Sequence, residues 1–460
     1  MQLAAAATLT RFLLPSDYGL AAMAMLCSAM TGYFTQLGVG GAIIQRPGLT
    51  TGNIRAAFTL TMSTGILGFF VLAAISPLLA IYFREPRLTL VIVAFGLNLI
   101  FRATGAVSAG LLRREFRMRD LAICDFLAYL LSTFGVGLPM AMHGYGVWAL
   151  VGSNVSQPLI ASLAYFIARP HPIAPAWERE SYAHITGFSA KASLTTTFEA
   201  LGGSMDMIVM GRIISPVAIG LYNRSLTLST QATYNVAIGL DRVFYPTLAR
   251  AAERGKEACC EMLKSSERQL MSLVLPLCAG AATAAPTIIP VIFGRQWSSA
   301  VPVYQVLCIV AALDASFHLP SIQLEILRRF RYKMLLQTCF ALCFGTGILI
   351  FAPRGGVIAV AMVYAALQLL RTLGIHLLSA RYLGVPVLSL LESWTPGIVC
   401  STLLTAVLLA VQRGLPTSMS SASPLKLAAL VLLSGATVVL VYRTFYESCV
   451  YKQWRALFQR

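Results

Sequence analysis

Residues 126–168 form a run of 43 residues without a single Asp, Glu, Lys or Arg, and this run limits the possible folds of the chain. A helix needs about 20 apolar residues to cross the hydrocarbon core of a bilayer, so the run is long enough for two crossings. The sequence His143-Gly-Tyr-Gly146 near its middle supplies a turn between them. The sequence therefore predicts adjacent membrane helices at 121–142 and 145–168.

Composition extends this prediction to the whole chain. Apolar residues make up 57% of it and charged residues only 12%, whereas soluble domains carry about twice that charged fraction. Further uncharged runs cover 56–83, 269–294, 334–353, 393–412 and 427–442. We predict an all-α polytopic membrane protein.

A turn near the start of the chain recurs near its middle. Arg11-Phe-Leu-Leu-Pro-Ser-Asp-Tyr-Gly-Leu20 has Arg, Pro, Gly and Leu at the same spacing as Arg212-Ile-Ile-Ser-Pro-Val-Ala-Ile-Gly-Leu221, at an offset of 201 residues. The same offset relates Ser28 to Ser229, Tyr33 to Tyr234 and Gly38 to Gly239. Seven such matches predict a duplicated membrane domain.

The repeat and the apolar runs together predict about fourteen helices. Residues 2–14 are too few to span a bilayer, yet the corresponding region of the second copy, 184–211, is a full span. We therefore expect the first helix to be incomplete in this sequence and its start to lie upstream. The other predicted spans are 18–44, 56–83, 88–111, 121–142, 145–168, 184–211, 216–241, 266–293, 300–325, 334–352, 356–379, 394–411 and 427–442.

The basic residues predict the orientation. Connections after even-numbered helices and the C-terminal tail hold about 23 of the 35 Lys and Arg residues, and such loops face the cytoplasm. Both termini are then cytoplasmic. The net charge of +17 needs no nucleic-acid partner.

No cofactor or metal site is expected. The ten cysteines include no Cys-x-x-Cys pair, and Cys27, Cys278, Cys308 and Cys400 lie in apolar spans, where we expect small buried side chains. The five histidines show no metal-ligand spacing. A Gly-x-x-x-x-Gly-Lys phosphate loop is absent, so the sequence predicts no ATPase on this chain.

Several short motifs lie along the chain at predicted helix ends and turns. They are Leu14-Pro-Ser-Asp-Tyr-Gly-Leu20, Leu37-Gly-Val-Gly-Gly-Ala-Ile-Ile-Gln-Arg46, Leu112-Arg-Arg-Glu-Phe-Arg117, Asp206-x5-Arg212, Gly220-Leu-Tyr-Asn-Arg224, Phe244-Tyr-Pro246 and Phe293-Gly-Arg-Gln-Trp297. Together these motifs resemble those of Wzx-type polysaccharide exporters, in the branch that includes WzxC and GumJ and within the superfamily shared with MATE exporters and the lipid II flippase MurJ. The resemblance covers nearly the whole chain and is weaker after residue 380.

The resemblance implies two pseudo-repeated six-helix lobes in a V, followed by a C-terminal helix pair. The expected parts are an N-lobe at 1–168, a cytoplasmic linker at 169–183, a C-lobe at 184–380 and the terminal pair with a basic tail at 381–460. It also implies a flippase in the bacterial inner membrane that moves polyprenyl-pyrophosphate-linked oligosaccharides by alternating access. Expected partners are the lipid-linked oligosaccharide, membrane lipids and the polysaccharide polymerase and export machinery.

Basic residues within spans are the candidates for contacts with the pyrophosphate and sugar. An arginine in a membrane span costs several kcal/mol unless it is paired or faces water. Arg102, Arg224 and Arg371 occupy such positions. The alternative is structural pairing or snorkelling, and we expect Arg371 to snorkel to the nearby interface.

Acidic residues within spans are the candidates for ion coupling. Glu199 and Asp314 lie deep enough to bind a proton or cation. Asp206 lies at a depth similar to that of Arg224 on the next helix, and we expect these two side chains to form a structural ion pair.

Two other functions compete with the flippase. A MATE-type small-molecule or cation antiporter would share the fold and favour a cavity richer in acids than in bases. A membrane glycan polymerase or ligase would need a sizeable extracytoplasmic loop, and the outward connections are only about a dozen residues long. The sequence therefore favours a flippase over an enzyme.

Overall fold

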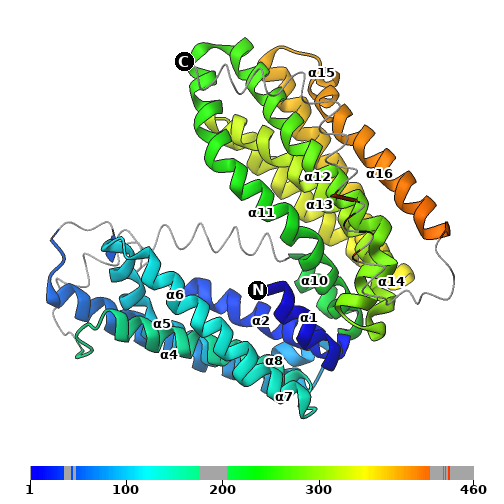
Figure 1. The fold of residues 1–460 in the computed structure, drawn as a ribbon. Coiled ribbons are helices and arrows are strands. Elements are labelled where there is room, and N and C mark those ends of the chain that lie inside the picture. Colours follow the sequence, from blue (N-terminus) through cyan, green and yellow to red (C-terminus); the bar gives the residue numbers. More distant parts are fainter. Residues whose placement is uncertain are drawn as a thin grey trace. The chain divides into compact units, whose positions relative to one another are not determined.

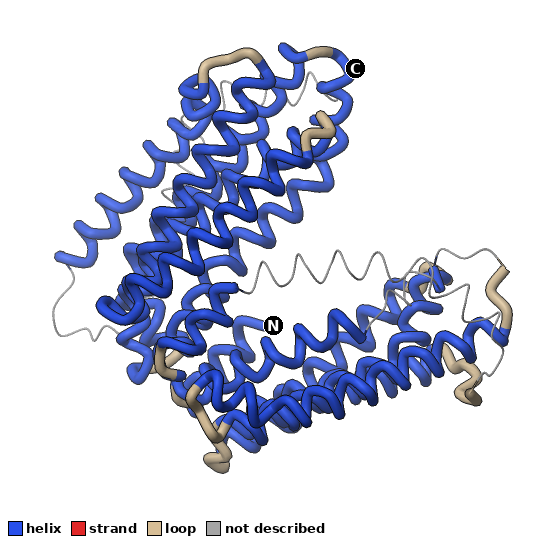
Figure 2. Tube along the Cα trace, turned by 180° about the vertical axis from the view of Figure 1, so that it is seen from behind, coloured by secondary structure: helices blue, strands red, loops and turns tan. Residues whose placement is uncertain are grey.

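A computed structural model describes residues 2–35, 43–44, 48–175 and 205–414, together with a few positions between 428 and 435. Within this part of the chain every element is a helix, and the connections are short (Figure 1, Figure 2). Eight of these helices are long and apolar enough to cross a membrane. The predicted all-helical polytopic fold is confirmed, whereas the number of fourteen helices stays a prediction.

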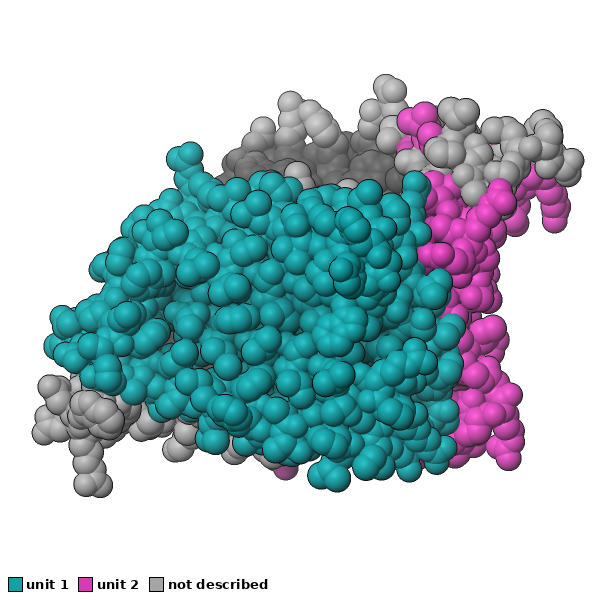
Figure 3. Space-filling model, turned by 90° about the horizontal axis from the view of Figure 1, so that it is seen from below, with its two compact units in different colours: residues 1–220 teal, residues 221–460 magenta. Residues whose placement is uncertain are grey.

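The chain forms two compact units, Met1–Gly220 and Leu221–Arg460, drawn in teal and magenta in Figure 3. The predicted N-lobe, linker, C-lobe and terminal pair have different boundaries from these units and stay predictions. Unit 1 contains α1 (Gln2–Phe12), α2 (Pro15–Thr35), α4 (Thr51–Phe83), α5 (Leu88–Arg114), α6 (Met118–Leu130), the π-helix η1 (Leu131–Gly137), α7 (Leu138–Met142), α8 (Val147–Ala168), α10 (Met205–Ile213) and the first turn of α11 (Pro216–Arg254).

Helix α5 is the central helix of unit 1. At Gly65 of α4, an added Cβ atom would lie 2.9 Å from the Leu99 carbonyl oxygen of α5, so the two backbones approach closely. Hydroxyl groups of two other neighbouring helices also reach α5. Ser28 Oγ of α2 donates to the Phe95 carbonyl at 3.0 Å, and Ser162 Oγ of α8 donates to Phe101 at 2.5 Å. In an apolar medium these bonds satisfy hydroxyls that would otherwise be costly to bury.

The repeated turn begins a helix in both of its copies. Pro15 and Pro216 are the first residues of α2 and α11, a position where the missing N–H of proline does no harm. Before α2, the Leu14 N–H donates to Asp17 Oδ2 at 2.9 Å, and before α11 the Ala218 N–H donates to Ser215 Oγ at 3.4 Å. The two copies therefore cap their helices with different side chains.

The glycines of the repeated turn bring its two copies together within unit 1. A Cβ atom added to Gly19 would lie 1.8 Å from the Pro216 carbonyl oxygen. A Cβ atom added to Gly220 would lie 1.9 Å from the Pro15 carbonyl oxygen. The contact is therefore reciprocal, and each glycine provides the space for the carbonyl of the opposite proline.

Helix α10 packs against the end of α4. Arg212 Nη1 donates to the carbonyl oxygens of Tyr82 at 2.5 Å and Ile81 at 3.2 Å, and its guanidinium lies 5.4 Å from the centre of the Tyr82 ring. The last carbonyls of a helix lack partners within the helix, and Arg212 supplies them with a cation. The arginine of the Asp206-x5-Arg212 motif thus has a structural role in unit 1.

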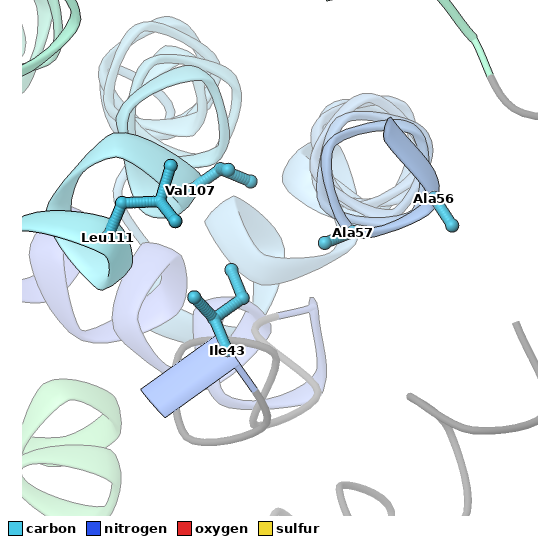
Figure 4. Close-up of a cluster of buried hydrophobic side chains, with 5 residues drawn as sticks. All are labelled: Ile43, Ala56, Ala57, Val107 and Leu111. Atoms are coloured by element: carbon cyan, nitrogen blue, oxygen red, sulfur yellow. The ribbon is translucent and has the colours of Figure 1, made fainter. Parts of the chain in front are cut away.

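The end of unit 1 that carries the Leu112-Arg-Arg-Glu-Phe-Arg117 motif holds the short segment 43–44. Ile43 packs between α4 and α5 with Ala56, Ala57, Val107 and Leu111 (Figure 4). Arg114 Nη1 donates to the Ile43 carbonyl at 2.7 Å. The second arginine of the motif therefore binds the backbone of the segment 43–44.

Residues 118–142 form one continuous rod that contains seven π-helical residues. Pro139 has no N–H and cannot donate the α-helical hydrogen bond to the carbonyl four residues before it. This missing bond accounts for the change from α-helical to π-helical hydrogen bonding just before Pro139. The predicted turn at 143–146 is confirmed, and Gly144 and Gly146 adopt positive φ values of 78° and 54°.

Unit 2 contains the rest of α11, which is continuous from unit 1. It also contains α12 (Lys256–Ile292), η2 (Arg295–Ala300), α13 (Val301–Ile326), α14 (Phe330–Leu383), α15 (Val387–Leu391), η3 (Glu392–Trp394) and α16 (Thr395–Gly414). Helix α12 packs against α13 and α16, and α13 packs against α14. Helix α14 is two helices joined at Gly356, where φ is 59° and ψ is −149°. The predicted spans 334–352 and 356–379 lie on either side of this break.

The cysteine prediction is confirmed for the four residues on which it rests, because Cys27, Cys278, Cys308 and Cys400 are all buried thiols. Among the described cysteines, only Cys339 and Cys343 are exposed, both on the first half of α14.

Candidate functional site

Two of the predicted site residues form an ion pair inside unit 2. Arg371 Nη2 on α14 donates to Asp314 Oδ1 on α13 at 2.8 Å. Gln368 Nε2, almost one turn before Arg371, donates to the same oxygen at 3.1 Å, and Arg371 Nη1 donates to Gln337 Oε1 at 3.1 Å. The sequence identified Arg371 and Asp314 separately, as a substrate contact and an ion-coupling residue, and gave no sign that they pair.

Two aromatic rings enclose the guanidinium of Arg371. Its central carbon lies 4.0 Å from the ring centre of Phe317 and 4.8 Å from that of Phe340. Only 10% of the Arg371 side chain is exposed. The expectation that Arg371 snorkels is therefore wrong, because the carboxylate, the amide and two π faces bind it inside the span.

Asp314 is the exposed member of this cluster. Its side chain is 53% exposed, and its Oδ1 atom accepts both the arginine and the glutamine donors. The Oδ2 atom accepts no hydrogen bond from the residues that the structure describes. A half-exposed carboxylate beside a fixed cation can accept a proton, a small cation or a hydroxyl group of a sugar.

Arg102 lies near the middle of α5, and its side chain is exposed. It forms no hydrogen bond or ion pair that involves the described part of the chain. An exposed cation at this depth requires water or an anionic ligand, because hydrocarbon would raise its free energy by several kcal/mol.

Three predicted residues remain, namely Arg224, Asp206 and Glu199. Arg224 is partly buried on α11, just over two turns after Pro216. Asp206 belongs to unit 1 and Arg224 to unit 2, so their pairing stays a prediction. Glu199 lies outside the described residues.

One buried cluster of titratable groups has no counterpart among the sequence predictions. Glu267 of α12 and His376 of α14 are fully buried, and Glu267 Oε1 lies 2.9 Å from His376 Nε2. The two residues are 109 positions apart. A lone glutamate near the start of an apolar run was the only signal in the sequence.

The comparisons with known proteins agree with the fold. A model of the polysaccharide biosynthesis protein family matches residues 8–302. Teichuronic acid biosynthesis protein TuaB of Bacillus subtilis is 24% identical over 81% of this chain and 76% of its own length. Lipopolysaccharide biosynthesis protein WzxC of Escherichia coli is 20% identical over 79% of this chain and 74% of its own length.

Solved structures share the fold at low sequence identity. Lipid II flippase MurJ in an inward closed conformation matches with a TM-score of 0.72 and 11% identity, over 97% of this chain and 96% of that one. A multidrug resistance MATE family transporter in an inward-facing conformation matches with a TM-score of 0.58 and 14% identity, over 83% of this chain and 94% of that one. The family match covers more than half of the residues, and the chain therefore belongs to the polysaccharide biosynthesis protein family.

Proposed function

We propose that this protein is a flippase that moves polyprenyl-pyrophosphate-linked oligosaccharides from the cytoplasmic to the outer leaflet of the inner membrane. Support comes from its family, from relatives named for teichuronic acid and lipopolysaccharide biosynthesis, and from a fold like that of a lipid flippase. The charged pyrophosphate and the polar sugar cannot cross hydrocarbon without a hydrated path.

Arg102 is the observation that carries this proposal. Its exposed guanidinium lies near the middle of an apolar helix, at the depth through which an anionic headgroup must pass. Arginine also matches phosphate oxygens with two parallel donors, which lysine cannot provide. An antiporter for organic cations would gain nothing from a cation at this position, because like charges repel.

The connections argue against a polymerase or ligase. Within the described residues, the turns expected on the outer face are short, such as residues 84–87 and 143–146. Turns as short as these cannot hold a catalytic domain.

The test is to delete the gene in its native host and to locate the lipid-linked oligosaccharides that accumulate. In a strain that lacks a flippase they remain in the cytoplasmic leaflet, where periodate added to spheroplasts does not oxidise them. We expect wild-type protein to restore surface polysaccharide, Arg102→Ala to reduce it about ten- to a hundredfold, and Arg102→Lys to restore it partly.

Two outcomes of the deletion experiment would contradict the proposal. Accumulated oligosaccharide accessible to periodate would indicate a later step, such as polymerisation. Unchanged surface polysaccharide with lower resistance to cationic drugs would indicate an antiporter. Protein amounts of all variants must match on immunoblots, and Arg87→Ala serves as the control, because Arg87 is an exposed residue outside the spans with one weak surface ion pair.

The proposed orientation has its own test. On a cysteine-free background, we expect an impermeant maleimide to label a cysteine at Ser299 in intact cells but not one at Arg329. Both positions are exposed, Ser299 in η2 and Arg329 before α14, so accessibility within the protein is matched. If the maleimide labels only the Arg329→Cys variant, the protein has the opposite orientation in the membrane.

A further inference from the structure

The buried cluster formed by Glu267, His376 and Ser393 joins three elements of unit 2. Glu267 lies on α12, His376 on α14 and Ser393 on η3, and their exposures are 0%, 0% and 2%. Glu267 Oε1 lies 2.9 Å from His376 Nε2, and Ser393 Oγ donates to Glu267 Oε2 at 3.1 Å. The Trp394 ring meets the imidazole edge to face at 5.4 Å between centres. Neither titratable side chain has solvent-accessible surface in this packing.

The partners of the imidazole determine how many protons the cluster holds. His376 Nδ1 lies 2.8 Å from the Thr372 carbonyl oxygen, which can only accept, so Nδ1 carries a hydrogen. If that were the only ring proton and Glu267 were ionised, a nitrogen lone pair and a carboxylate lone pair would face each other at 2.9 Å. A second proton therefore lies between Nε2 and Oε1.

Electrostatic energies also favour a second proton on the Glu267–His376 pair. With the second proton the pair has no net charge, whereas without it the pair is a buried anion. An uncompensated anion in a dry interior costs several kcal/mol.

The other charged groups on the elements packed around the cluster are engaged or exposed. On α12, the Lys264 ammonium donates to Ser389 of α15, and Arg268 is exposed. On α14, Arg371 binds Asp314. Glu325 of α13 pairs with Lys333, and His318 of α13 is partly buried with interactions of its own. The remaining charged groups on α12, α14 and η3 are exposed, namely Lys256, Glu257, Glu261, Arg331, Arg354, Arg381 and Glu392.

A polar path connects the cluster to the Asp314 site. Thr372 Oγ1 donates to the Leu313 carbonyl, next to Asp314, at 3.1 Å. The Thr372 carbonyl accepts from His376, as described above. A shift of α14 relative to α13 would therefore disturb both clusters at once.

We propose that Glu267 and His376 form a proton-binding site, occupied while α12, α14 and η3 pack together and emptied when they separate. On release, the proton between Nε2 and Oε1 passes to water and leaves a neutral imidazole with Nδ1–H beside an ionised carboxylate. The charge of the pair changes from 0 to −1, which hydration stabilises only in the separated state. The role of this step in the transport cycle rests on the proposed flippase function, whereas the bound proton does not.

The first test measures the proton directly in purified full-length protein in lipid nanodiscs. With ¹⁵N-labelled histidine at pH 7.5, we expect His376, assigned by comparison with His376→Gln, to be an imidazolium or to share its proton with Glu267. In the second case infrared spectra show a carboxylic acid band that Glu267→Gln removes. A neutral imidazole beside an ionised carboxylate overturns the proposal. Ser379→Ala is the control, because Ser379 is a buried hydroxyl on the same helix bonded to Gln323 and should leave the His376 signals unchanged.

The second test separates the proton site from the flippase function. We expect Glu267→Gln, with normal protein amounts, to export about ten- to a hundredfold less polysaccharide, a usual size for coupling between sites. Export at the wild-type rate would overturn the role of the proton in the cycle. A bound proton in a wild-type protein that exports nothing would contradict the flippase function and leave the proton site intact.

Discussion

Replacing Gly19 or Gly220 with alanine should nearly abolish the folded protein. The new methyl group would lie 1.8 Å from the Pro216 carbonyl oxygen in one variant and 1.9 Å from the Pro15 carbonyl oxygen in the other. Both obstacles are backbone atoms, so no side-chain rotation relieves the clash. Overpacking costs typically 1–3 kcal/mol and occasionally more, and here two helix starts must move apart by more than 1 Å. The measurement is the yield of monodisperse protein in detergent and its melting temperature.

Gly345→Ala is the matched control, because Gly345 lies within α14 and nothing is within 4 Å of its added Cβ atom. Alanine also has the higher helix propensity, so this variant should be as stable as wild type or slightly more so. Equal behaviour of Gly19→Ala and Gly345→Ala would show that the first turns of α2 and α11 do not pack as described.

The double variant tests the reciprocity of the contact. Each single substitution already forces the same two backbones apart, so the second methyl group meets less resistance. We expect the double variant to lose clearly less stability than the sum of the two single losses. Full additivity would show two independent contacts.

The repeated turn shows which features of the fold the sequence alone can predict. Proline and glycine at a fixed offset predicted two similar helix starts, because these residues have restricted or unusually free backbones. The repeat did not predict that the copies contact each other, since similarity of two segments carries no information on their distance. Within the described residues, the uncharged runs at 56–83, 269–294, 334–353 and 393–412 fall almost wholly within helices long enough to span a membrane, because the cost of burying charge in hydrocarbon acts on every residue of a span.

The candidate site was predicted only in part, for reasons of geometry. The distance of Arg371 from a helix end suggested snorkelling, but that argument ignores what lies beside the side chain. Phe317 on α13 and Phe340 on the first half of α14 decide its direction, and their positions follow only from the packing of these helices. The pairing of Glu267 with His376 was likewise hidden, since each residue alone resembles an isolated polar group.

Removing Asp314 should damage unit 2 far more than removing Arg371. Asp314→Ala leaves a guanidinium that is only 10% exposed without its counterion, and breaking a buried ion pair in this way costs about 3–5 kcal/mol. Arg371→Ala leaves a carboxylate that is 53% exposed and still accepts the Gln368 amide. We therefore expect low yields for Asp314→Ala and near-normal yields for Arg371→Ala. The opposite order would show that the guanidinium has another route to water.

The double variant Asp314→Ala/Arg371→Ala shows whether the ion pair only stabilises the fold or also takes part in transport. It removes both charges, so the yield of folded protein should recover most of what Asp314→Ala loses. If the pair only holds α13 to α14, export of polysaccharide recovers with the yield. If the exposed Asp314 carboxylate takes part in transport, the protein folds but exports at least about tenfold less, because one lost interaction of 1.4 kcal/mol already gives that factor. We expect the second result, since a purely structural pair has no reason to leave one carboxylate oxygen facing outward while the arginine is enclosed.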